Sequence, residues 1–239
     1  AMKENSTTRA FPLNDIQLAY WIGRRNVLEW GNVHTHFYFE FDGHVDPRRL
    51  EQAMRLAIAN HGMMRARFLD SAEQESAESV PPFDLRVDDL TELSPADVEG
   101  RLAATRDRMS HSSPLRDEAS PPYELVLSRM REGRTRLHLN LDMLVFDMVS
   151  MRLLLGELGA RYEGRSPAAA VTDFDFRKYL ELERAAESSE QFQQAMRYWS
   201  ERCSDLPPGP RLPLPLSQDR AAIHSPRMTA RRHQLPAAR

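Results

Sequence analysis

Two aspartates five residues apart, Asp142 and Asp147, are the side chains of this sequence whose type and spacing best suit acid–base chemistry. Asp142 follows an alternating strand on its polar side, and Asp147 directly precedes an apolar segment of helical spacing. Two carboxylates at such a strand-to-helix junction can hold different pKa values and act as acid and base. Asp147 is equally well placed to cap the helix, and Asp142 to pair with an arginine. The local pattern leaves both interpretations open.

Two histidines, His34 and His36, lie two positions apart on a predicted strand, a spacing that can place two imidazoles on one zinc ion. No third ligand is evident near them in the sequence, and a polar strand face accounts for them equally well. Cys203 is late in a predicted helix with no histidine nearby, so we expect a small buried residue and not a nucleophile. The sequence contains neither a phosphate-binding glycine loop nor a serine nucleophile elbow.

The composition is that of an ordinary globular protein, and it excludes several classes of function. The net charge of −3 over 239 residues gives no basic footprint for nucleic acid. No apolar run approaches the roughly 20 residues that span a bilayer, so we expect no membrane association. The single cysteine excludes an internal disulfide and fits a reducing, cytoplasmic setting. Residues 1–10 are polar and are expected to be a disordered or tag-derived leader.

Hydrophobic periodicity predicts alternating strands and helices, which indicates an α/β (α+β layered) fold with a mixed sheet flanked by helices. The predicted strands cover residues 33–41, 64–69, 83–87, 123–130 and 134–141, the last two as a hairpin. The predicted helices cover residues 14–24, 47–61, 94–111, 148–162, 174–187 and 190–204. The acidic, serine-rich stretch 70–82 is predicted to be an exposed loop.

The strand 134–141 and the helix after it position the aspartates. Leucines at 137, 139 and 141 share one face of this strand, and His138, Asn140 and Asp142 share the other. The helix 148–162 has apolar residues at helical spacing, from Met148 to Tyr162, and is predicted to be buried. Prolines cluster between 207 and 215, which forbids a helix and favours extended backbone before a strand-like segment at 227–235.

Four segments, in order, resemble the signature motifs of the heterocyclization (Cy) domains of nonribosomal peptide synthetases. Residues 11–24 resemble FPLTxxQxAYxxGR, with Asn14 in place of the usual Thr or Ser. Residues 60–66 resemble RHxxLR, with Asn60 and Met64 as departures. Residues 142–150 resemble DxxxxDxxS, and residues 206–214 fit LPxxPxLPL at every fixed position. Each match alone is weak, but four in the family's order over nearly the whole chain are strong.

The resemblance also separates this chain from amide-forming condensation domains, which carry HHxxxDG at the core motif. Asp142 stands where the first histidine would be, Met143 at the second, and Met148 replaces the glycine. Asp142 and Asp147 stay the catalytic candidates, and among the four motifs they also mark the family. By the resemblance we expect Asp142 to hold the motif loop through an ion pair, and Asp147 to cap the following helix while lining the tunnel. The resemblance further implies that the substrate tunnel and its motifs involve five more residues, namely Met143, Ser150, Tyr20, Arg24 and His138.

The implied reaction joins an acyl thioester on one carrier protein to a Cys, Ser or Thr on the next and then closes a thiazoline or oxazoline ring. The substrates ride on the phosphopantetheine arms of carrier domains, and no cofactor is expected to bind directly. The implied partners are carrier proteins, the C-terminal half of the same domain and adjacent synthetase domains. The implied fold is the N-terminal lobe of a chloramphenicol-acetyltransferase-like protein.

By this interpretation, residues 11–205 are the N-terminal lobe, and residues 206–239 are a proline-rich linker and the start of the C-terminal lobe. The family residues implicated in cyclodehydration lie in the C-terminal half, so we expect the chain alone to be inactive. Two alternatives stay open. One is a non-catalytic half-domain that binds a carrier protein or complements a separate C-terminal half. The other is a different acyltransferase of this fold, against which Met143 counts, because such an enzyme needs an active-site histidine.

Overall fold

The main sheet of the computed structural model, which describes residues 10–24, 34–118, 120–165 and 174–209, has the strand order β2-β7-β6-β5. These strands are β2 (His34–Asp42), β5 (Arg86–Asp89), β6 (Tyr123–Arg129) and β7 (Arg134–Asp142). β7 pairs antiparallel with both β2 and β6, whereas β5 runs parallel to β6. The sheet is therefore mixed, as the sequence predicted.

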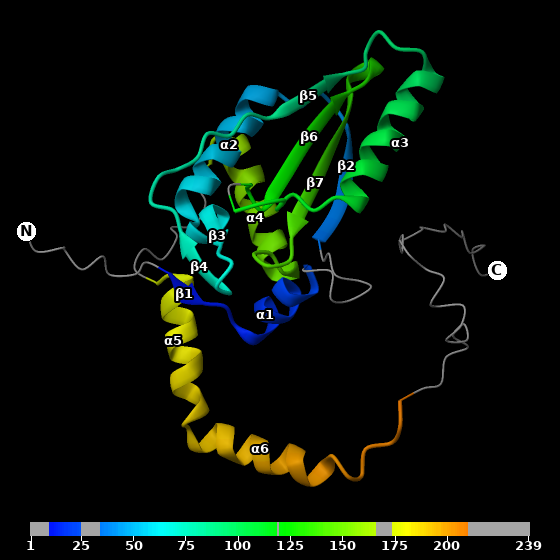
Figure 1. Cartoon of the computed structure of the whole chain (residues 1–239). Coiled ribbons are helices and arrows are strands. Elements are labelled where there is room, and N and C mark those ends of the chain that lie inside the picture. Colours follow the sequence, from blue (N-terminus) through cyan, green and yellow to red (C-terminus); the bar gives the residue numbers. More distant parts are fainter. Residues whose placement is uncertain (1–9, 25–33, 119, 166–173, 210–239) are drawn as a thin grey trace, which may run out of the picture.

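Helices cover both faces of this sheet (Figure 1), which completes the predicted layered α/β arrangement. α2 (Pro47–Asn60) and α4 (Met148–Tyr162) pack against each other on one face, and α3 (Pro95–His111) lies on the other. The main core lies under α2 and α4, where the three predicted β7 leucines, Leu137, Leu139 and Leu141, are buried with α2 side chains. The opposite, polar face of β7 lies on the α3 side, so the alternation predicted for this strand is confirmed.

The β6–β7 hairpin turns at Glu132 and Gly133, as predicted. Their φ angles of 59° and 73° are both in the left-handed region, which glycine adopts without strain. A short 3-10 turn, η3 (Arg131–Gly133), connects the two strands.

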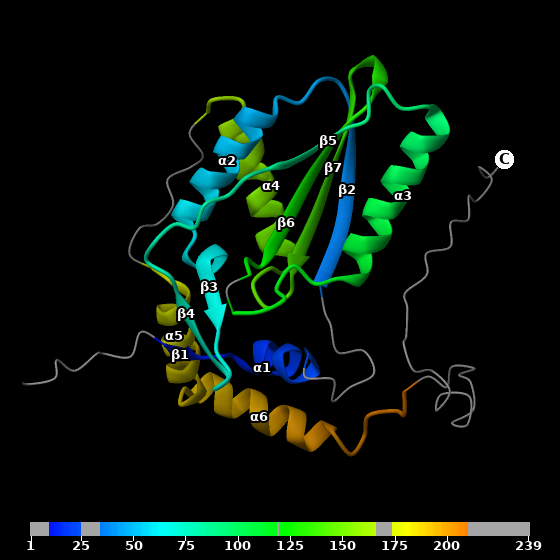
Figure 2. The same ribbon diagram turned by 45° about the horizontal axis from the view of Figure 1, so that its top comes forward.

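The opening segment contributes one strand to a small sheet and then forms a capped helix below the lower end of the main sheet (Figure 2). β1 (Phe11–Pro12), β4 (Glu73–Ser76) and β3 (Ala66–Phe68) pair in the order β1-β4-β3. α1 (Asp15–Ile22) follows β1, and Asn14 caps it through a capping box with Gln17. Asn14 thus does the work of the Thr or Ser that is usual at this motif position.

The last two described helices extend away from the sheet (Figure 1). They are α5 (Phe176–Glu187) and α6 (Glu190–Arg202), capped by Asp175 and Ser189. Leu180 of α5 is buried, whereas every residue of α6 is exposed. α5 begins two residues later than predicted, and α6 ends two residues earlier than predicted.

Three predictions about exposure are wrong. Cys203, predicted to be a small buried residue, is exposed at the C-cap of α6, a helix that no other described element covers. The stretch 70–82, predicted to be an exposed loop, contains β4, and Gln74 within it is fully buried. Its composition is that of a loop, but pairing with Phe11 and Pro12, far away in sequence, makes it the middle strand. The helix 148–162 is buried on one face only: Met151, Leu154 and Leu158 are buried, whereas Met148 is 66% exposed.

The strand limits also shift. Residues 64–69 begin with a 3-10 turn, η2 (Gly62–Arg65), before the short β3, and the strand predicted at 83–87 lies at Arg86–Asp89. The expected leader, apart from Ala10, lies outside the described residues, as do most of the proline-rich segment and the strand-like stretch 227–235. Residues 206–209, which are described, form no helix or strand.

Candidate functional site

The carboxylate of Asp142 is fully buried at the end of β7 and is held from three directions. Its Oδ1 accepts hydrogen bonds from the Arg24 guanidinium and, at 3.0 Å, from the backbone N–H of Leu144. Its Oδ2 accepts a hydrogen bond of 2.7 Å from the hydroxyl of Ser113. A buried charge needs both a partner and hydrogen bonds, and this carboxylate has both.

Arg24 directly follows Gly23, the C-cap of α1, and its side chain reaches Asp142. Its side chain is 13% exposed, and a second guanidinium nitrogen donates to the carbonyl of Leu115 at 3.4 Å. Ser113, between α3 and β6, also accepts the N–H of Leu115 at 3.1 Å. The ion pair considered for Asp142 from the sequence is thus present, and it ties the opening motif to the core motif.

Asp147 is exposed and caps α4, as the second sequence interpretation required. Its Oδ1 accepts the backbone N–H of Ser150 at 2.7 Å and the Ser150 hydroxyl at 2.6 Å. These two hydrogen bonds from Ser150, first the hydroxyl and then the N–H, lower the pKa of Asp147, because they stabilise its charged form. Asp147 therefore carries a negative charge at neutral pH, at the positive end of the helix.

The two aspartates do not form a dyad. Each carboxylate has its own set of donors, and within the described residues no hydrogen bond joins them. The sharing of a proton that splits the pKa values of paired carboxylates is therefore not available here. Asp142 binds the start of the loop 143–147, and Asp147 starts the helix after it.

Three other predicted tunnel residues lie at or beside this loop. Met143 is half-buried, and its sulfur accepts the hydroxyl of Thr35 at 3.2 Å. Ser150 is half-buried at the start of α4. Tyr20 packs with a small apolar cluster formed by Leu13, Ala66, Phe68 and Leu144. The structure thus gathers Tyr20, Arg24, Asp142, Met143, Asp147 and Ser150 around one loop.

His138 lies apart from the loop, four residues before Asp142 on β7, or roughly 13 Å along a strand. It is fully buried, and its Nδ1 is 3.0 Å from the Nε2 of His36, with the two rings nearly parallel. The pKa of each imidazole is lowered to about 4, chiefly by burial, with a smaller contribution from His34 at His36 and from His36 at His138. Both are therefore neutral at neutral pH, and His138 belongs to a polar layer beneath α3.

The histidines considered as zinc ligands are engaged in that same layer. The Nε2 of His34 lies 3.2 Å from the carbonyl of Met109, and the Nδ1 of His36 lies 2.8 Å from the Ser110 hydroxyl. Within the described ranges, no three His, Cys, Asp or Glu side chains form a cluster that suits a metal ion. His34 and His36 thus lie on a polar strand face and contact α3, which is the second of the two interpretations of these histidines.

Two contributors to this site escaped the sequence-based prediction. Ser113 belongs to a connecting segment, where the sequence carries no signal for contact with Asp142. Gln17 is part of the opening motif and donates to the carbonyl of Leu144 at 2.8 Å. The position of Gln17 in the opening motif was the only sequence signal for its role. Its partner Gln74 carried no signal, because it lies in the segment predicted to be an exposed loop.

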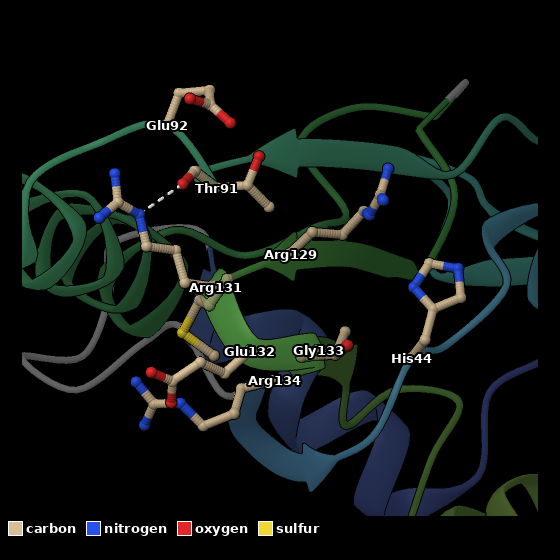
Figure 3. Close-up of a pocket in the computed structure, with 10 residues that line it drawn as sticks. His44, Thr91, Glu92, Arg129, Arg131, Glu132, Gly133 and Arg134 are labelled. Carbon is tan, nitrogen blue, oxygen red and sulfur yellow. Dashed lines mark hydrogen bonds between the residues drawn. The ribbon is translucent and has the colours of Figure 1, made fainter.

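A cavity of about 460 Å³ lies at the opposite end of the sheet, around the β6–β7 turn (Figure 3). Its lining includes Arg129, Arg131 and Arg134, whose guanidinium groups point in different directions. Arg131 is anchored to the carbonyl of Thr91 at 2.8 Å. Arg134 is eight residues from Asp142 along β7, or roughly 26 Å. This cavity is therefore separate from the aspartate loop.

The fold is that of a condensation domain. The chain is similar to the cyclization-docking bidomain of the nonribosomal peptide synthetase EpoB from Sorangium cellulosum, with a TM-score of 0.76 and 32% identity. That match covers 88% of this chain and 42% of the EpoB chain. It confirms the predicted chloramphenicol-acetyltransferase-like lobe. Residues 8–235 match the condensation domain family, and the chain belongs to that family.

Two curated relatives are similar at the level of sequence. Phenyloxazoline synthase MbtB of Mycobacterium tuberculosis is 38% identical over 215 residues, which are 85% of this chain and 14% of MbtB. Pyochelin synthetase PchE of Pseudomonas aeruginosa is 38% identical over 231 residues, which are 95% of this chain and 16% of PchE. The chain thus spans a small part of these relatives. Among the helices of the described ranges, none has the length and apolar character that a membrane crossing demands.

Proposed function

We propose that this chain is part of a heterocyclization domain, which condenses a carrier-bound acyl thioester with a carrier-bound Cys, Ser or Thr and cyclodehydrates the product. The observation that carries the proposal is the loop that starts at Asp142. At the position of the first motif histidine of amide-forming condensation domains, this chain has a carboxylate that is fully buried and ion-paired with Arg24. The named oxazoline chemistry of the relative MbtB supports the same assignment.

The first step needs no base at the position of Met143, the second histidine of the amide-forming motif. The amine nitrogen attacks the thioester carbon, an amide bond forms, and the thiol of the donor phosphopantetheine arm leaves with a proton. An α-amino group has a pKa of about 7.7–8.0, so a useful fraction is uncharged near neutral pH. Holding amine and thioester together contributes about 7–11 kcal/mol, whereas a general base adds roughly 10²–10⁴-fold. Positioning therefore outweighs the missing imidazole.

The second step closes the ring. The side-chain sulfur or oxygen attacks the new amide carbon, and that carbon loses its oxygen as water to give a thiazoline or oxazoline. Loss of water requires protonation of a poor leaving oxygen. Asp142 is a poor candidate for this proton transfer, because all its contacts are with the protein and it is fully buried. We assign it the role of holding the loop, and we assign Asp147 the roles of helix cap and tunnel wall.

In this proposal the chain supplies one lobe, and the rest of the domain supplies the other wall of a tunnel for two phosphopantetheine arms. The exposed apolar side chains of α5 and α6 support the proposal that another part of the domain packs against these helices. Phe192, Met196 and Trp199 are 40%, 51% and 56% exposed and follow one another at helical spacing on α6. Such an apolar stripe on a soluble helix marks a surface that another part of the protein covers.

The proposal is tested by incubating the complete protein that carries this domain with an acyl-loaded donor carrier and acceptor carriers loaded with Cys, Ser or Thr. Mass spectrometry of the acceptor arm distinguishes the amide from the ring, which is lighter by one water. Ring product from at least one acceptor is expected. Amide without ring in every case would show an amide-forming condensation domain. No transfer at all would favour the alternative, a carrier-binding or complementation half-domain.

A further inference from the structure

Two buried glutamines from distant parts of the chain form a reciprocal amide pair beside the aspartate loop. Gln17 lies on α1 and Gln74 on β4, and they are 4% and 0% exposed. The Nε2 of Gln17 donates to the Oε1 of Gln74 at 3.0 Å, and the Nε2 of Gln74 donates back to the Oε1 of Gln17 at 2.8 Å. Buried amides of this kind persist only where their hydrogen bonds are satisfied.

The pair also binds backbone on both sides. Gln17 donates a second hydrogen bond to the carbonyl of Leu144 at 2.8 Å, and its Oε1 also accepts the N–H of Asn14 at 3.2 Å. Gln74 donates its second hydrogen bond to the carbonyl of Pro12 at 3.3 Å. Gln17 thereby uses both donors and both acceptor sites of its amide. No other uncharged side chain of this length supplies the same set.

Leu144 is the residue of the loop that these contacts fix. Its N–H donates to Asp142, its carbonyl accepts from Gln17, and its side chain is buried against Leu13 and Phe68. The backbone N–H groups of the next two residues, Val145 and Phe146, both donate to the carbonyl of Asp142 at 3.0 Å. Asp142 therefore binds the N–H of Leu144 and Gln17 binds its carbonyl, so that both side chains hold the same turn.

We propose that Gln74, acting through Gln17, is a positioning residue that fixes the loop between Asp142 and Asp147 for ring formation. The inference rests on the proposed function for its catalytic consequence. Neither glutamine is assigned a contact with reacting atoms. With Gln74 removed, Gln17 loses a donor to its Oε1 and an acceptor for one of its N–H groups. Its side chain is then free to rotate away from Leu144, and the loop loses one of its two anchors.

Two variants and one control separate positioning from general stability. Gln74→Met fills a similar volume and forms none of the hydrogen bonds. Gln17→Glu keeps the acceptor for Asn14 and Gln74 but, when ionised, has no hydrogen to donate to Leu144. The control is Thr135→Val, which removes a buried hydrogen bond of 2.9 Å to the carbonyl of Gly43 at the far end of β7. All three are made in the complete protein.

The first measurement is hydrogen–deuterium exchange of the amides at 144–146, at a temperature where each variant is folded. Loss of a buried hydrogen bond predicts exchange about tenfold faster in Gln74→Met and Gln17→Glu, and unchanged exchange in Thr135→Val. In Gln17→Glu, lowering the pH protonates the carboxyl and restores a donor, so protection returns once intrinsic exchange is corrected for pH. Unchanged exchange in both variants would overturn the proposal, whatever the protein synthesises.

The second measurement is the rate of ring formation under carrier saturation. Both glutamine variants should lower kcat about tenfold and leave the KM for the carriers unchanged, because both side chains are buried. Thr135→Val should retain the wild-type kcat. Faster exchange with an unchanged kcat would also overturn the positioning role. Absence of ring product from the wild type would reject the proposed function, and exchange alone would then decide whether Gln74 holds the loop.

Discussion

The guanidinium of Arg24 and the buried carboxylate of Asp142 form an ion pair that joins the end of the opening motif to the start of the core motif. The two residues are 118 positions apart in the chain. Two of the sequence motifs that identify this family are therefore a single structural unit. The loop between Asp142 and Asp147 is held by contacts from α1 and from the segment around Ser113, and β4 supports the α1 contact through Gln74.

Replacing Arg24 by Met should destabilise the fold strongly. It leaves the buried Asp142 carboxyl without its cation, and breaking a buried pair in this way costs about 3–5 kcal/mol. Denaturant unfolding of wild type and variant measures the difference. Arg165→Met is the matched control, because the side chains of Arg165 and its partner Glu163 are 66% and 59% exposed, and an exposed pair contributes about 0–1 kcal/mol. Equal losses in the two variants would contradict the role given to the buried pair.

Asp147→Ala should lower both stability and ring formation, because it removes the cap of α4 at the loop. Loss of an N-cap costs about 0.5–2 kcal/mol. Asp147→Asn keeps an oxygen acceptor for Ser150 and should retain most of both properties. Thermal unfolding and the ring-forming assay check the two effects. If Asp147→Ala left folding and ring formation intact, the assigned role would be wrong.

The charge of Asp147 also predicts a dependence on pH. Its folded-state pKa is lowered, so its stabilising contribution is present above the unfolded value of 3.8 and is lost as the pH falls through the folded value. Asp147→Asn has no such proton to bind. The difference in unfolding free energy between wild type and Asp147→Asn should therefore shrink when the pH is lowered from 5 to 3. A difference that stays constant over this range would exclude a lowered pKa.

The sequence predicted best those elements whose signal is local. The β6–β7 hairpin and α4 each carry their own periodicity and their own turn or cap, and both were found at the predicted places. The alternation of side chains alone predicted the polar face of β7, and it also predicted that Asp142 lies on that face at the end of the strand. The cap at Asp147 likewise depends on residues within one turn of it.

The contacts around the loop escaped prediction because they are not local. β4 has the composition of a loop, and only pairing with Phe11 and Pro12 makes it a strand that buries Gln74. The layer beneath α3 was also missed, since the pairing of His36 with His138 depends on the register of β2 with β7. An alternating pattern gives the face of a strand but not its neighbour.

The histidine pair beneath α3 should make the lobe sensitive to mild acid. Both pKa values are lowered from 6.5 to about 4, chiefly by burial, so the unfolded chain binds more protons between these values. Stability is therefore full above pH 6.5 and falls as the pH drops toward 4. Arg106, Arg108 and Arg136 add to the effect, whereas Glu124 and Asp88 oppose it.

The double variant His36→Gln, His138→Gln removes both titrating rings and should flatten this dependence. Thermal midpoints at pH 7.5 and pH 5 measure it, with the exposed His44→Gln as control. The wild type and the control should lose more stability than the double variant on acidification. Parallel losses in all three would show that the buried pair does not titrate in this range.

The apolar stripe of α6 should behave in opposite ways in the isolated chain and in the complete protein. Replacing Met196 and Trp199 by Lys removes two exposed apolar side chains, so it should reduce self-association of the 239-residue chain in sedimentation experiments. In the complete protein we expect the rest of the domain to cover this stripe, and two buried lysines there should lower the thermal midpoint. Gln194→Lys, on the face that hydrogen-bonds Glu190, should change neither property. A stripe with no partner would tolerate the two lysines equally well in both proteins.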